Sequence, residues 1–172
     1  MGFGIISEGR RNKFNWSPQL GRYAGFFIFE VAFYAAYLYG MSFSQACASP
    51  FWLPDTVLLC ALLLNRPRDW WIYILGALPI RLFSPVAHGN PMWFLLAMFA
   101  IDSAKGLTLA ALLRRFLPDP LRLGSLKDFI LFCGFAVVLV PAASAFAGAW
   151  MNYLRGRHYY WQEWEDWFMG DA

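Results

Sequence analysis

Charged residues are scarce in this sequence of 172 residues: Asp, Glu, Lys and Arg together make up 15%. A soluble domain usually carries about 25%, which argues against a soluble globular protein. Histidine and cysteine are also rare, with two and three residues. The cysteines Cys47, Cys60 and Cys133 form no CxxC motif and have no nearby histidine, so the sequence indicates no zinc or dithiol centre. We expect neither a metal nor a cofactor.

The sequence also lacks the common catalytic motifs, namely HExxH, a Walker loop and GxSxG. Its histidines, His88 and His158, both fall in predicted loops. We therefore expect no enzymatic activity from this chain. The net charge of +3 is modest, and we expect no nucleic-acid partner.

Apolar residues are abundant instead. They make up 59% of the chain, and aromatic residues, including nine Trp, make up 20%. A small soluble domain exposes too much of its area to bury this much apolar surface, whereas lipid accommodates it, and Trp is typical of the membrane interface. The sequence predicts an all-α integral membrane protein whose main partner is the lipid bilayer.

Proline and capping residues mark the expected helix starts, at Ser17-Pro18, Ser49-Pro50, Arg66-Pro67, Asn90-Pro91 and the Ser125–Asp128 capping box. The apolar runs between them predict about five transmembrane helices and the start of a sixth. These spans cover residues 23–43, 50–65, 68–84, 91–113 and 126–152, with the sixth beginning near Trp161. A cleaved signal peptide is the alternative interpretation of the first run, but that run is too long and contains Glu30.

Basic residues predict the orientation. Ten Lys and Arg residues fall before the first span or in alternate loops, and Arg155 and Arg157 alone fall on the opposite side. By the positive-inside rule, residues 1–22 form a cytoplasmic N-terminal segment, and residues 23–172 form a multi-pass domain in the plasma membrane. The sixth apolar segment has room for only about 18 Å of helix. We therefore expect the domain to be incomplete at the C-terminus.

Several ionisable residues lie inside the apolar spans. Such charges cost about 2.5–3.5 kcal/mol each to insert, so they usually meet partners or a wet cavity. Asp55 and Arg81 are expected at similar depth in a helix hairpin, either as a structural ion pair or as part of a polar ligand cavity. Asp102 and Lys105, three residues apart, share a helix face and can pair. Asp171 is expected at comparable depth, where the three side chains would bind a cation, a proton or a polar ligand, or act as interhelical glue.

Other residues predict irregular or close packing. The helix after Ser49 begins either at Pro50 or at Pro54, and the second choice puts Asp55 in the first turn, where the helix dipole favours a carboxylate. Pro79 and Pro141 predict kinks. Ser144 and Gly148 have the small-xxx-small spacing that lets helices approach closely.

A family resemblance runs through these motifs. Residues 50–55 (PFWLPD), 76–82 (GALPIRL), 102–106 (DSAKG), 113–115 (LRR), 126–129 (LKDF) and 167–172 (WFMGDA) together resemble the first type of bacterial membrane-associated sensor domain. The resemblance covers residues 20–172. It implies a multi-span sensory input at the N-terminus of a histidine kinase or diguanylate cyclase, as in two-component systems, with catalysis and homodimerisation belonging to a missing output domain.

The sequence therefore predicts a sensory input domain in the bacterial inner membrane. A small-molecule ligand, a membrane protein partner or a membrane state would act on Asp55, Arg81, Asp102, Lys105 and Asp171. The alternative is a small-molecule transporter or channel component, which would use the same intramembrane charges. A membrane-bound enzyme is a third interpretation, for which the sequence offers no catalytic group.

Overall fold

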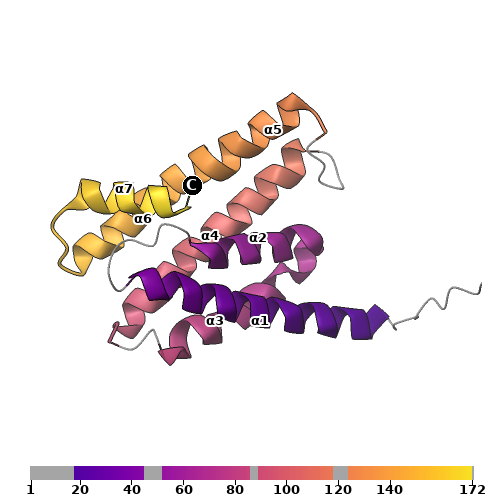
Figure 1. Cartoon of the computed structure of the whole chain (residues 1–172), viewed down its shortest axis with the longest axis horizontal. Coiled ribbons are helices and arrows are strands. Elements are labelled where there is room, and N and C mark those ends of the chain that lie inside the picture. The colour runs from indigo at the N-terminus through magenta and orange to yellow at the C-terminus, as the bar shows by residue number, and fades with distance from the viewer. Residues whose placement is uncertain (1–17, 45–51, 86–88, 118–123, 172) are drawn as a thin grey trace, which may run out of the picture.

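The computed structural model describes residues 18–44, 52–85, 89–117 and 124–171, and within these ranges the regular structure is entirely helical. Figure 1 shows long helices packed lengthwise with shorter ones between them. In chain order the elements are α1 (Pro18–Ser44), α2 (Leu53–Leu64), the 3₁₀ turn η1 (Pro67–Asp69), α3 (Trp70–Phe83), α4 (Met92–Phe116), α5 (Leu126–Cys133), the π-helical segment η3 (Gly134–Leu139), α6 (Val140–Leu154) and α7 (Tyr160–Asp171).

In the described part of the chain, three helices are long and apolar enough to cross a bilayer: residues 21–42 of α1, the whole of α4, and the continuous 29-residue run of α5, η3 and α6. Their apolar side chains face outward as well as inward, as lipid contact requires. This agrees with the predicted membrane class.

Helices α2 and α3 are shorter than the predicted spans at 50–65 and 68–84. With 12 and 14 residues, they measure about 18 and 21 Å at 1.5 Å per residue, less than the ~30 Å of hydrocarbon. The expected count of five spans therefore stays a prediction. The sixth predicted helix, expected near Trp161, is α7 and begins at Tyr160.

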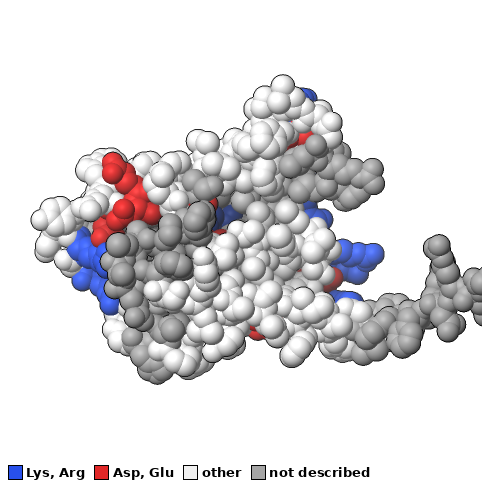
Figure 2. All heavy atoms as spheres, in the orientation of Figure 1, with Lys and Arg blue, Asp and Glu red and all other residues white. Residues whose placement is uncertain are grey.

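Charged side chains link the elements at both ends of the bundle. At the first, which we call the Arg114 end, Arg22 of α1 lies 3.4 Å from Asp69 of η1, and Arg114 of α4 donates to carbonyls at the end of α2. At the other, the Arg155 end, the Arg155 guanidinium lies 4.7 Å from the Phe94 ring. Figure 2 shows charged side chains gathered at opposite ends of the molecule, with a mostly uncharged surface between them.

The proline and serine signals place most helix starts correctly. Ser125 accepts a hydrogen bond from the Asp128 amide and caps α5. Helix α2 begins at Leu53 with Pro54 in its first turn, as the second of the two alternatives predicted, whereas the start at Pro50 lies outside the described residues. Pro91 was predicted to be the first residue of its helix, but it is the N-cap of α4, which begins one residue later at Met92.

Both predicted proline kinks stay predictions, but the surroundings of the two prolines differ. Pro141 lies in the first turn of α6, directly after the π-helical η3. A proline removes one backbone hydrogen bond, and a π segment upstream is one way to accommodate that loss. Pro79 lies inside α3, where its kink stays a prediction.

Candidate functional site

Helix α4 carries the centre of the candidate site. Asp102 and Lys105 lie three residues apart and therefore on one face of α4, where both are buried, with 5% and 8% of their surface exposed. Lys105 is 13 residues from Met92 and nine from Arg114, which is about 20 Å and 14 Å along the helix axis. The two charges therefore lie well inside the apolar length of α4.

Arg81 of α3 is the partner of Asp102. Its Nη2 donates to Asp102 Oδ2 at 2.7 Å, and both side chains are buried. The guanidinium also lies 5.2 Å from the ring centroid of Tyr37 and 5.1 Å from that of Trp52. A guanidinium that contacts two aromatic rings is stabilised by their quadrupoles as well as by its carboxylate. This pair therefore joins α3 and α4 to α1 and to the start of α2.

Lys105 connects two further elements. Its Nζ forms an ion pair with Asp55 of α2 and another, at 2.5 Å, with Asp171 of α7. Asp55 stands in the first turn of α2, where the helix dipole favours a negative charge. The Trp52 amide donates to the Gly170 carbonyl at 3.0 Å. The ammonium and this backbone bond together tie the start of α2 to α7.

The structure thus brings all five predicted residues together, but with different pairings. We expected Asp55 to pair with Arg81 because their spans form a hairpin. That prediction is wrong: among the described residues Arg81 pairs with Asp102, and Asp55 pairs with Lys105. Asp102 and Lys105 share a face as predicted, but the ion-pair partner of each lies on another helix. We call these five side chains the ion cluster.

The ion cluster contains one carboxylate more than it contains cations. Asp55, Asp102 and Asp171 face Arg81 and Lys105. In addition, Asp102 Oδ1 is buried and has no hydrogen-bond partner among the described residues. A buried polar atom without a partner is costly, so this oxygen is available to a further donor.

A polar cavity of about 820 Å³ leads to the ion cluster. Arg81, Asp102 and Asp171 line it at the depth of the cluster. Toward the Arg155 end its wall is formed by polar side chains of α6, α7 and the loops beside them, among them Asn90, Asn152, Arg155, Arg157, Gln162, Glu163 and Asp166. Arg157 and Asn152 both donate to Glu163, at 2.9 and 2.8 Å. The cavity can therefore admit water or a polar ligand from that end.

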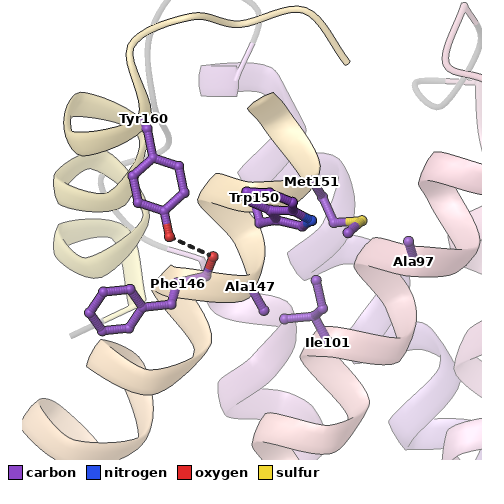
Figure 3. Close-up of a pocket in the computed structure, with 7 residues that line it drawn as sticks. All are labelled: Ala97, Ile101, Phe146, Ala147, Trp150, Met151 and Tyr160. Carbon is purple, nitrogen blue, oxygen red and sulfur yellow. Dashed lines mark hydrogen bonds between the residues drawn. The ribbon is translucent and has the colours of Figure 1, made fainter. Parts of the chain in front are cut away.

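A second cavity, of about 470 Å³, is apolar. Figure 3 shows its lining side chains on α4, α6 and α7: Ala97, Ile101, Phe146, Ala147, Trp150, Met151 and Tyr160. The Tyr160 hydroxyl donates to the Phe146 carbonyl at 3.2 Å. No charged group lines this cavity, so it offers no chemistry beyond apolar contact.

Small residues on α6 allow α7 to approach the ion cluster. Ser144 and Gly148 are buried, and the Ser144 hydroxyl donates to the Pro141 carbonyl at 2.9 Å. The Trp167 indole lies directly over Gly148. Trp167 is one helical turn before Asp171, so this contact helps to set the depth and orientation of Asp171.

Sequence reasoning overlooked two residues at the site and one at the Arg114 end. Tyr37 and Trp52 contact Arg81, and Arg114 donates to the carbonyls of Leu63 and Asn65 at 2.8 and 2.6 Å. The spacing of α1 contained a signal for Tyr37, because the buried residues of that helix, Phe29, Phe33, Ala36, Tyr37 and Gly40, follow a helical period.

Comparison with known proteins gives one result for this fold. The family model described as MASE1, membrane-associated sensor 1, matches residues 26–172. That range contains the whole ion cluster and both cavities. The searches of curated proteins and of solved structures gave no significant match.

Proposed function

We propose, because the chain belongs to the MASE1 family of membrane sensory domains, that it is the input domain of a bacterial signalling protein. The family is sensory and non-catalytic, in keeping with the lack of catalytic motifs. In this proposal the ion cluster is the sensing element. A small-molecule ligand or a membrane protein partner changes its ion pairs, and a cytoplasmic output module, a histidine kinase or diguanylate cyclase that can dimerise, receives the change.

The distribution of basic residues supports a plasma-membrane orientation with the N-terminus in the cytoplasm. The Arg114 end carries Arg22, Arg66, Arg68 and Arg114 on α1, α4 and the α2–α3 connection, while the Arg155 end carries Arg155 and Arg157. By the positive-inside rule, the Arg114 end is cytoplasmic and the polar cavity opens outward. In this multi-pass arrangement α2 and α3 complete the bundle as a pair of short helices.

The observation that carries the proposal is the bridging position of Lys105. One ammonium holds carboxylates from α2 and α7, and the second of these, Asp171, lines the polar cavity. Breaking a buried ion pair without compensation costs roughly 3–5 kcal/mol. A charged ligand that replaces one partner removes much of that cost, and so it can favour a second helix arrangement. Such differential binding is what a sensor requires.

The test uses the chain fused to a cyclase or kinase reporter in bacterial membranes. We expect Asp102→Ala and Arg81→Ala each to change the basal or stimulated output while the protein still inserts into the membrane. Lys127→Gln is the matched control, because Lys127 is exposed at the start of α5. Unchanged signalling from both cluster variants would refute the assignment of the sensing element.

A transporter or channel component is the second candidate, favoured by the depth to which the polar cavity penetrates. The two functions differ in one measurement. A transporter moves solute across liposomes that contain this chain alone, whereas a sensor domain produces no flux. Solute accumulation above empty liposomes, abolished by Asp102→Ala, would favour transport.

A further inference from the structure

The ion cluster has an unbalanced charge. Asp55, Asp102 and Asp171 supply three carboxylates, and Arg81 and Lys105 supply two cations. Four of these side chains are at most 8% exposed, and that of Asp55 is 16% exposed. An unpaired charge in a low-dielectric interior is expensive, and a group in this position commonly takes up a proton instead.

A second observation points to the same ligand. Asp102 Oδ1 is buried without a hydrogen-bond partner among the described residues, although Asp102 Oδ2 accepts from Arg81. An oxygen in this state either carries a proton or receives one from a protonated neighbour. Asp102 is also one of the residues that line the cavity leading to the Arg155 end.

On these grounds we propose that the ion cluster binds one exchangeable proton, shared among Asp55, Asp102 and Asp171, which enters from the Arg155 end through the polar cavity. The inference rests on the proposed function and names its signal: proton availability on the side to which the cavity opens. With the proton bound, the cluster is neutral. Without it, one excess negative charge weakens the contact that joins α2, α4 and α7.

A metal ion fits the site less well. The described residues contain no group of three or more His, Cys, Asp or Glu that could hold one. Arg81 and Lys105 already occupy the contacts that a metal cation would need. A proton requires only one oxygen and adds almost no volume, so it can bind beside both cations.

Other titratable or charged groups face the cluster or its entrance. Tyr37 comes from α1, Asp55 from α2, Arg81 from α3, Asp102 and Lys105 from α4, and Glu163, Asp166 and Asp171 from α7; the connection between α6 and α7 adds Arg155, Arg157 and Tyr159 at the entrance. Glu163 is engaged by Arg157 and Asn152. It can relay protons at the entrance without holding the proton of the cluster.

The experiment measures protonated carboxyl groups directly. The full chain in lipid nanodiscs is titrated while the carbonyl band of carboxylic acids is followed by infrared spectroscopy, with D₂O exchange to assign it. Glu30 is half-buried, its Oε1 is buried without a hydrogen-bond partner, and it forms no ion pair among the described residues, so Glu30→Gln serves as the reference background.

Charge counting gives opposite expectations for two kinds of variant. In the reference background, Asp55→Asn, Asp102→Asn and Asp171→Asn each remove the excess charge and should abolish the titrating band. Lys105→Gln removes a cation and should add a second protonated carboxyl. A purely structural cluster would not give this opposite response. Each of the three Asn variants tests the proposal by itself, so if one of them fails to fold, the other two still give the result.

Two results would overturn the proposal. One is an infrared result: either the reference protein shows no titrating carboxylic-acid band, or all three Asn variants leave that band unchanged. The other is a band that Na⁺ abolishes at constant pH and choline does not, which would identify a metal cation as the ligand. The sensory function is tested separately, because the nanodisc experiment does not measure the activity of an output module. If Asp102→Ala alters signalling but no bound proton is detected, the proposed sensory function is retained and the proton proposal is rejected.

Discussion

The contact between Gly148 and Trp167 offers a way to move α7 without changing any charge. A Cβ added at Gly148 would lie 2.3 Å from Trp167 Cδ2 and 2.5 Å from Cε3. Carbon atoms in favourable contact are about 3.5–4.0 Å apart, so the indole must move by roughly 1 Å or more. Asp171 follows Trp167 by one turn on the same face and would move with it, away from Lys105.

The expected magnitude for Gly148→Ala follows from two opposing effects. Overpacking a tight contact typically costs about 1–3 kcal/mol, while alanine in a helix interior gains up to about 1 kcal/mol over glycine. We therefore expect a net loss of about 1–2 kcal/mol in the free energy of unfolding. Signalling should change more than stability, because the Lys105–Asp171 contact of 2.5 Å has little tolerance for a shift of this size.

Gly106→Ala is the matched control. Gly106 is a buried helical glycine on α4, next to Lys105. Its added Cβ would meet Leu58 at 3.5 Å and Leu62 at 3.6 Å, which is ordinary van der Waals contact. This variant should be neutral or slightly stabilising and should keep the wild-type output.

The assay is unfolding in mixed detergent micelles, read by tryptophan fluorescence, together with the output of the reporter fusion. If Gly148→Ala unfolds and signals like the wild type, the close approach of α7 to α6 plays no part in positioning Asp171. Equal damage from Gly106→Ala would show that any added methyl in the bundle has the same effect, and the reasoning from the contact distance would fail.

Two further predictions concern charged contacts. Arg81→Gln and Asp102→Asn should each cost roughly 3–5 kcal/mol in the free energy of unfolding. The double variant should cost about 2 kcal/mol less than their sum, because it removes both members of the pair and so leaves neither buried without its partner. Unfolding midpoints measure this, and additive values would contradict the pair. Arg114→Met removes the donor to the carbonyls at the end of α2 and should cost about 1–3 kcal/mol. Hydrogen exchange should then rise in the last turn of α2 and not in its first, while the exposed Arg115→Met should leave both unchanged.

The membrane class and most helix starts could be predicted from the sequence because both depend on local chemistry. Ser125 caps α5 through the Asp128 amide, and Pro54 fits the first turn of α2. The lengths of α2 and α3 were predicted less well. An apolar run such as that between Pro50 and Asn65 shows which residues tolerate lipid, but it does not show where the backbone begins to follow a helix.

The membership of the ion cluster was also predictable, because a charge in an apolar span needs a partner or a cavity. The pairings were not. Asp55 and Arg81 were matched by the expected depth of a hairpin, but depth does not specify rotation about a helix axis. The rotation depends on tertiary packing, such as the contact of Arg81 with Tyr37 and Trp52, which links residues far apart in the chain.

The observed pairings also bear on the choice between structural glue and a ligand site. Interhelical glue is most stable when its charges balance, as they do for Arg81 and Asp102. Lys105 differs, because it is shared by two carboxylates from α2 and α7, so either contact can strengthen when the other is neutralised. In the proposed sensor, a shared cation therefore offers two alternative pairings, one with Asp55 and one with Asp171. A balanced pair alone would have favoured one state only.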